Sequence, residues 1–147
     1  MIQGAYSRSS SGQSLVEVMV TVTIAVLILV ALVGGATVGV RNIQYSRSRA
    51  RAMELNREAT EWLRSERAKG WSAFLVSLGS DDYYCLNSLS LDNPGHCEAT
   101  ELIDSFFKRE VNIVKESENK IIITVSTFWN DSQGDHREEV ETYLTSW

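Results

Sequence analysis

Glu17 is the side chain whose position most limits its chemistry, because it stands directly before an uncharged, mostly apolar run from Val18 to Val40. A carboxylate beside hydrocarbon costs about 2.5 to 3.5 kcal/mol at the centre of a membrane helix and less near an interface. Such a charge is tolerated when it is paired. We therefore expect Glu17 to form an ion pair with a cation. The alternative is an interfacial carboxylate that reaches the lipid headgroups.

Two cysteines form a second candidate site. Cys85 and Cys97 lie on either side of the turn-forming segment Asn93-Pro94-Gly95. A disulfide across a loop of this length contributes about 3 kcal/mol of stability, and such bonds persist only in oxidising compartments. Because spacing alone does not prove pairing, a pair of free thiols remains the alternative.

The other residues with ligand or catalytic potential do not form a recognisable constellation; they are His96, His136, Asn130, Asp131 and Asp135. The pair His96-Cys97 lacks the further ligands of a zinc site, and neither histidine stands at a recognisable spacing from a nucleophile. We expect both to be solvated loop histidines. The three residues at 130–135 could gather calcium, but their spacing is not that of a standard calcium loop, so a plain turn is expected. The sequence thus predicts no enzyme activity, no cofactor and no metal.

The apolar run predicts a membrane helix. Helical rise makes it about 35 Å long, slightly more than the roughly 30 Å of bilayer hydrocarbon. A secretory signal has a shorter apolar core behind a basic region, whereas Arg8 is the one basic residue ahead of this run. The alternative is a signal that is cut near Gly34-Gly35-Ala36.

A second helical pattern follows directly. No Pro or Gly occurs between Arg41 and Lys69, and Gly70 provides a stop. Apolar residues recur at steps of three and four, which is typical of one buried helix face; they are Ala52, Leu55, Ala59, Trp62 and Leu63. We expect one continuous helix from about residue 15 to residue 69, roughly 80 Å long.

The remainder predicts a loop and then a sheet. Residues 71–104 have loop composition, with a short helical turn around 99–103. Residues 105–147 show strand alternation, which predicts an antiparallel β-meander. Its first strand carries Phe107, Val111 and Ile113 on one face, with Arg109 as the exception. Turns are expected at 118–119 and 130–134, and a third strand at 137–147. The predicted fold class is α+β, with a long N-terminal helix packed on a small antiparallel sheet.

Charge distribution bears on partners and topology. The net charge is −5, but a basic collar follows the apolar run and consists of Arg41, Arg47, Arg49, Arg51 and Arg57. Attraction to anionic headgroups explains this collar, and without a recognised motif nucleic-acid binding is not expected. The positive-inside rule places the collar in the cytoplasm, whereas a disulfide places the C-terminal part outside it. The aromatics Tyr83 and Tyr84 belong either to a subunit contact or to packing under the loop.

The segment Gly12-Gln13-Ser14-Leu15-Val16-Glu17 and the apolar helix after it resemble the processing and assembly segment of type IV pilins and pseudopilins. The shared features are a short polar leader, a Gly before the cut, an acid at the fifth position after it and an uninterrupted apolar helix. Beyond about residue 40 only the architecture is similar, a long helix followed by a loop and an antiparallel sheet.

The resemblance implies a processing step and a set of partners. A prepilin peptidase would cut between Gly12 and Gln13, removing a leader of residues 1–12, and would N-methylate Gln13. Residues 13–40 would be the transmembrane and assembly helix, and residues 41–70 its amphipathic half. Glu17 would pair with the terminal amine of a neighbouring subunit and set its register. The implied partners are other pilin subunits, an inner-membrane assembly platform and, before assembly, membrane lipid. The C-terminal domain would lie outside the cytoplasm and, after assembly, on a pilus or the cell surface.

Two departures from the family pattern narrow the expectation. Gln13 stands where Phe or Met is usual, and Gly34-Gly35 stands where major pilins typically carry a helix-kinking Pro. The second departure favours a minor pilin or pseudopilin. A type II secretion pseudopilin and a DNA-uptake minor pilin remain alternatives. A more distant one is a bitopic membrane protein with a small extracellular binding module.

Overall fold

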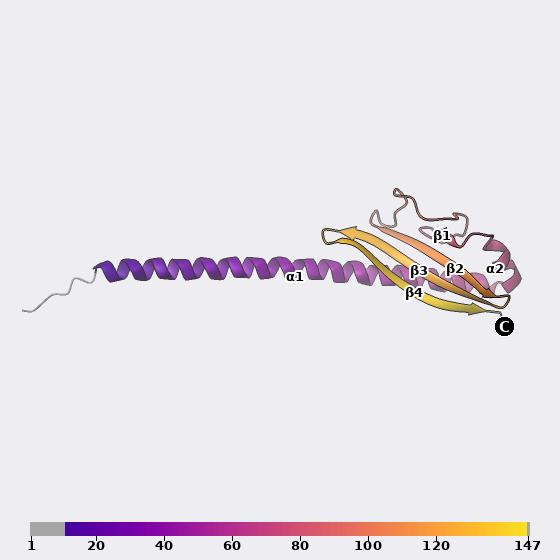
Figure 1. Ribbon diagram of the computed structural model, residues 1–147, viewed down its shortest axis with the longest axis horizontal. Helices are drawn as coiled ribbons and strands as arrows, with labels where there is room; N and C mark the ends of the chain where they lie inside the picture. The colour runs from indigo at the N-terminus through magenta and orange to yellow at the C-terminus, as the bar shows by residue number, and fades with distance from the viewer. Residues whose placement is uncertain (1–10, 147) are drawn as a thin grey trace, which may run out of the picture. The chain divides into compact units, whose positions relative to one another are not determined.

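The computed structural model describes the backbone of residues 11–146 and the side chains of residues 15–146, so most of the expected leader lies outside the described residues. The elements are α1 (Ser11–Ala68), α2 (Trp71–Ser77), β1 (Tyr83–Cys85), β2 (Phe107–Ser117), β3 (Lys120–Asp131) and β4 (Gly134–Thr145) (Figure 1). The α+β fold predicted from the sequence is confirmed. The chain divides into two compact units, the first ending at Gln44 and the second beginning at Tyr45.

The first unit consists of the N-terminal part of α1. Among its described side chains, all are exposed from Leu15 to Gln44. Its threonines donate their hydroxyls to the preceding turn: Thr23 bonds the carbonyl of Met19 at 2.7 Å and Thr37 that of Val33 at 2.9 Å. In hydrocarbon, polar groups must be satisfied internally, and these bonds do so within the helix. By length and composition, this is a helix that could cross a membrane.

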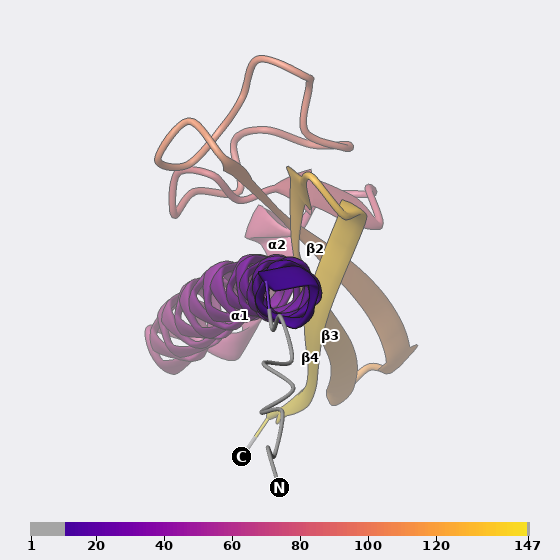
Figure 2. The same cartoon turned by 90° about the vertical axis from the view of Figure 1, so that its left-hand side faces the viewer.

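The second unit is the rest of α1 together with the sheet. Strands β1, β2, β3 and β4 are neighbours in that order and every pair is antiparallel. From Tyr45 onward α1 lies along one face of this layer, as Figure 1 and the turned view in Figure 2 show. Four residues of the predicted stripe are buried there, with Ala52, Ala59 and Leu63 at 0% exposure and Leu55 at 2%, and the fifth, Trp62, is partly buried.

The inward face of the sheet follows the predicted alternation. Its apolar residues join Ala59 and Leu63 in one core cluster; they are Val111, Ile113, Ile121, Ile123, Val125 and Leu144. Two-residue turns connect the long strands, because Ser117 pairs with Lys120 and Asp131 pairs with Gly134. The φ of 121° at Gly134 is rarely adopted by other residues. Tight turns therefore fix the register that aligns the apolar faces.

Segment 71–104, predicted as a loop, contains two short elements as well. Helix α2 contributes buried Phe74, and Leu78 directly after it is also buried. Strand β1 pairs with β2 through Tyr84↔Val111. Around residues 99–103 the structure has a turn and then an isolated bridge between Ile103 and Phe107, not the predicted helical turn. These elements are too short to show a clear hydrophobic period, and packing on the core determines them.

Candidate functional site

Glu17 lies on the exposed surface of α1 among large apolar side chains. Its neighbours Val16 and Val18 are 60% and 58% exposed. Within residues 15–146 its carboxylate has no hydrogen-bond or ion-pair partner, although its backbone carbonyl accepts the Thr21 hydroxyl. Gly12 and Gln13 lie in the first turns of the same helix, and their side chains are outside the described set. The arrangement offers an anion for a cation from outside residues 15–146.

The surface around Glu17 is apolar along the whole first unit. It exposes large hydrophobic side chains that include Leu15, Met19, Ile24, Leu27, Ile28, Leu29, Leu32 and Ile43. Contiguous exposed apolar surface on this scale marks a site of membrane or protein interaction. A surface of this kind is compatible with a membrane or with an apolar protein partner.

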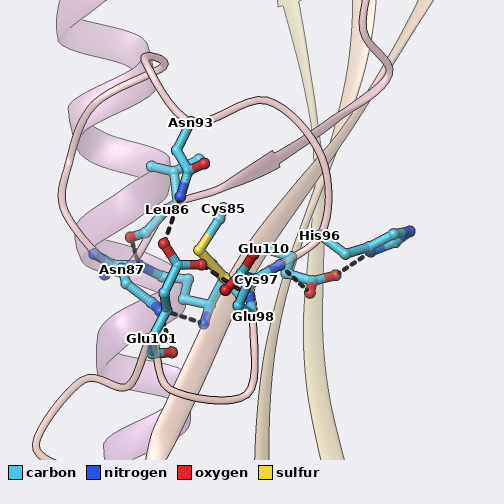
Figure 3. The surroundings of a disulfide bond; sticks show 10 residues. Cys85, Leu86, Asn87, Asn93, His96, Cys97, Glu98, Glu101 and Glu110 are labelled. Atoms are coloured by element: carbon cyan, nitrogen blue, oxygen red, sulfur yellow. Dashed lines mark hydrogen bonds and ion pairs between the residues drawn. A yellow bond between two sulfur atoms is a disulfide. The ribbon is translucent and has the colours of Figure 1, made fainter.

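The cysteines are bonded to each other, as the spacing allowed. Cys85 and Cys97 form a disulfide with their Cα atoms 4.7 Å apart (Figure 3). The Cys85 amide also donates to the carbonyl of Asn93 at 2.9 Å, and Pro94 forms a bridge with Tyr84. A Glu101 carboxylate oxygen lies within 4.8 Å of both sulfurs. Because both sulfurs belong to the disulfide, they are not available as thiolate ligands for a metal.

Two carboxylates hold the segment around the disulfide (Figure 3). Glu110 accepts the Cys97 amide at 2.9 Å and lies 2.7 Å from Nδ1 of His96. The Glu101 carboxylate accepts hydrogen bonds from Nδ2 of Asn93 at 2.9 Å and from the backbone amide of Glu98 at 2.8 Å. Both acids are thereby engaged in fixing the loop.

The two histidines differ in their surroundings. His96 is exposed, as predicted, and its ring centroid lies 4.5 Å from that of Tyr83. The prediction for His136 is wrong: it lies within β4, partly buried, and stacks on Trp129 at 5.2 Å. The register Trp129↔His136 causes this burial, because cross-strand partners share one face of the sheet. The two tyrosines also differ in burial: Tyr83 is 42% exposed, whereas Tyr84 is 2% exposed.

The polar residues at 130–135 stabilise the β3–β4 turn. Asn130 donates to Oδ1 of Asp135 at 2.6 Å. Oδ1 of Asp131 accepts the Gln133 amide at 2.7 Å and lies 2.9 Å from Nε2 of His136. The Gln133 amide and then the His136 ring lower the pKa of the Asp131 carboxyl. The turn itself is residues 132–133, shorter than the predicted 130–134, because β3 continues to Asp131 and β4 begins at Gly134.

Arg109 is the polar residue whose role sequence patterns missed. It is 2% exposed and faces the core. Its guanidinium donates to the carbonyls of Leu55 at 2.8 Å and Leu86 at 2.9 Å, and binds Glu58 at 2.8 Å. The available signal was the alternation of β2, which places Arg109 on the same buried face as Phe107, Val111 and Ile113. Arg109 thus joins α1, β2 and the segment after β1 through a satisfied buried charge.

A second polar link joins α1 to the sheet. Asn56, which is fully buried, accepts the Thr127 hydroxyl at 2.7 Å and donates to the carbonyl of Glu138 at 2.9 Å. Buried polar groups that are fully paired specify one packing arrangement. Like Arg109, this pair positions the helix and has no reactive group free for chemistry.

The basic collar is partly used within the protein. Arg49 pairs with Glu138 at 3.0 Å, and Arg51 pairs with Glu54 at 2.9 Å and Asp104 at 3.0 Å. The remaining collar residues, Arg41, Arg47 and Arg57, have no ion-pair partner within residues 15–146. Fewer cations are therefore free for lipid headgroups than the sequence suggested.

Comparison of the chain with protein-family models, curated proteins and solved structures finds no match.

Proposed function

We propose that the protein is a structural subunit, of the minor pilin type, of a type IV pilus or a related filament. The observation that carries this proposal is the exposed apolar helix whose first turns hold Glu17, a carboxylate without a hydrogen-bond or ion-pair partner within residues 15–146. The pilin-like architecture of a long apolar helix and an antiparallel sheet supports it. The resemblance of the segment Gly12–Glu17 to a prepilin processing site supplies the chemistry.

In this function the apolar helix has two successive environments. After synthesis, lipid covers the apolar surface from Leu15 to Ile43. After cleavage between Gly12 and Gln13, the new N-terminal ammonium, which is N-methylated, is a cation at the N-terminal end of the helix, the end that carries Glu17. The Glu17 of one subunit pairs with the Gln13 ammonium of a neighbour, which lowers the cost of holding the carboxylate among apolar side chains.

Repetition of that contact gives a filament. One subunit offers the carboxylate and the next offers the ammonium, so the two sides of the contact differ. Heterologous contacts that do not close into a ring generate helical filaments. The ion pair fixes register, while the surrounding apolar helices supply most of the packing. The prepilin peptidase, the other filament subunits and an inner-membrane assembly platform are the partners of this function.

The second unit, which begins at Tyr45 and is called the globular unit below, would lie outside the cytoplasm. The Cys85–Cys97 disulfide supports this topology, because such bonds persist in oxidising compartments. The partial use of the basic collar within the protein weakens the opposing charge argument.

The mature N-terminus tests the processing step. The full chain is made together with a prepilin peptidase, and its intact mass and N-terminal sequence are determined. We expect a chain that begins at N-methylated Gln13. In Gly12→Val the bulkier side chain should block the cut, whereas Ser11→Ala should leave it unchanged. Persistence of residues 1–12 in the wild-type protein would overturn the processing claim and favour a bitopic membrane protein.

Glu17→Leu tests the assembly step separately. We expect this variant to be cut like the wild type but to be absent from sheared filaments on immunoblots. Glu98→Gln is the control, because the Glu98 carboxylate is exposed on the globular unit and has no side-chain partner within residues 15–146. Normal incorporation of Glu17→Leu would remove Glu17 from the assembly role.

A further inference from the structure

A groove lies on the globular unit near the β3–β4 turn. It encloses about 580 Å³, within the range of about 300–1,000 Å³ typical of small-molecule sites. Three aromatic residues, Phe106, Phe128 and Trp129, are among those that line it. Phe106 is 38% exposed and its neighbour in the groove, Leu102, is 40% exposed. Apolar ring surface is therefore available to a ligand.

Polar groups in the groove are available as well. Lys108 and Ser105 line it, and within residues 15–146 neither side chain has a hydrogen-bond or ion-pair partner. Asn130 and Asp135 also line it; Nδ2 of Asn130 donates to Oδ1 of Asp135, and no contact within those residues uses the other Asp135 oxygen. The groove thus combines an ammonium, a hydroxyl, an amide and a carboxylate with aromatic walls.

A strained turn presents Phe106 to the groove. Asp104 and Ser105 have φ values of 52° and 57°, a conformation that non-glycine residues seldom adopt. The turn is held by reciprocal backbone bonds between Ile103 and Phe107 at 2.7 and 2.9 Å, and by the ion pair of Asp104 with Arg51 at 3.0 Å. Backbone strain of this kind concentrates at functional sites.

A second groove on the outer sheet face lacks this combination. Its lining includes Tyr83, His96, Glu110, Arg137 and Glu139. Its charged groups already contact one another, His96 with Glu110 and Arg137 with Glu139. A ligand there would have to compete with internal pairs, whereas the groove beside Phe106 offers side chains without partners.

We propose that the groove beside Phe106 binds a saccharide of one or two rings. Sugar rings present apolar C–H faces, which pack on aromatic rings, and hydroxyls at their rims, which need donors and acceptors such as those of this groove. The cation of Lys108 is offset by the anion of Asp135, so the lining does not favour a strongly anionic ligand such as a phosphate. Recognition then depends on stacking against Phe106, on hydrogen bonds that Lys108 and Asn130 donate, and on hydrogen bonds that the Asp135 carboxylate accepts.

Saturation-transfer NMR tests this site. The full chain is held in a detergent without a sugar headgroup, and glucose, N-acetylglucosamine and cellobiose are the probes. We expect transfer to the ring protons of at least one probe. Removing the stacking ring in Phe106→Ala should weaken its binding about tenfold, and Lys108→Ala should weaken it about threefold to tenfold.

Matched controls keep this test independent of folding and of filament assembly. Tyr143→Ala removes a ring that is 54% exposed on the same sheet but outside the groove, and should leave binding unchanged. Circular dichroism should show that all three variants fold. The proposal is overturned if none of the three sugars binds, or if Phe106→Ala binds a sugar as tightly as the wild type does. None of these results depends on cleavage at Gly12, so the proposed function stands or fails separately.

Discussion

The two units of the chain differ in the burial of their apolar side chains and in the partners of their charged groups. In the first unit the apolar side chains from Leu15 to Ile43 are exposed and Glu17 has no partner within residues 15–146. In the second unit the stripe of α1 is buried, and Arg109 meets two carbonyls and a carboxylate. In each unit an ionisable group lies beside apolar surface, Glu17 in the first and Arg109 in the second, but within residues 15–146 only Arg109 finds its partners.

This difference indicates where each unit obtains its stability. The second unit has a core and a disulfide, as expected of a domain that folds on its own contacts. The described part of the first unit is a helix without a core of its own. Under the proposed function, an outside partner covers its apolar surface and pairs with its acid. The comparison predicts that substitutions in the second unit act on folding and that substitutions in the first act on assembly.

Arg109→Met should produce the largest loss of stability. The substitution leaves the carbonyls of Leu55 and Leu86 without their buried donor and Glu58 without its cation. We expect the free energy of unfolding to fall by about 4 kcal/mol, measured by chemical denaturation of the full chain in detergent. Arg57→Met is the control, since Arg57 is exposed on the same helix, and should change stability by about 0.5 kcal/mol or less. Equal effects of the two variants would show that the buried network contributes no net stability.

Loss of the disulfide should have the next largest effect. Replacing Cys85 and Cys97 by Ser opens a loop of sequence separation 12, and we expect a loss of about 3 kcal/mol. Reduction of the wild-type protein should give the same change in the denaturation midpoint. The amides of Cys85 and Cys97, bonded to Asn93 and Glu110, should then exchange hydrogen faster. Unchanged midpoints after both treatments would contradict the assigned role.

How far the sequence predicts each unit depends on the range of the interactions. The stripe Ala52–Leu63 and the alternation of β2 and β3 are local periodicities, and the fold class followed from them. The partners of Arg109 were not predictable, because Leu55 and Leu86 reach it only once α1 and the sheet have packed. The exposed apolar helix and the position of Glu17 were predictable, since both are properties of consecutive residues.

The short elements and His136 show the same limit. Helix α2 and strand β1 have too few residues for a period, so only their packing through Phe74 and Tyr84 reveals them. The predicted third strand began at Arg137, one residue after His136. Because a two-residue turn pairs Asp131 with Gly134, the register places His136 opposite Trp129, and this turn length was the missing information.

The hairpin near His136 should show a small pH effect. The Gln133 amide and the His136 ring lower the pKa of Asp131 in the folded protein. A carboxyl with a folded pKa below its unfolded value of about 3.9 stabilises the protein above that pH, and this stability is lost as the pH falls through the folded pKa. The Tm of Asp131→Asn should therefore lie slightly below that of the wild type at pH 7 and converge with it below about pH 4. A difference that persists in acid would mean that Asp131 acts through geometry and not through its charge.

Glu17→Leu should have the smallest effect on folding, and this prediction sharpens the comparison most directly. The Glu17 carboxylate has no hydrogen-bond or ion-pair partner within residues 15–146 and Glu17 is no member of the core clusters, so its removal takes no such interaction from the sheet or its core. We expect the denaturation midpoint of the globular unit to match that of the wild type while incorporation into filaments is lost. Tryptophan fluorescence follows the globular unit, because the described tryptophans Trp62, Trp71 and Trp129 all lie within it. A shifted midpoint would mean that Glu17 acts through the fold, and the division between a self-sufficient unit and one that depends on partners would then be wrong.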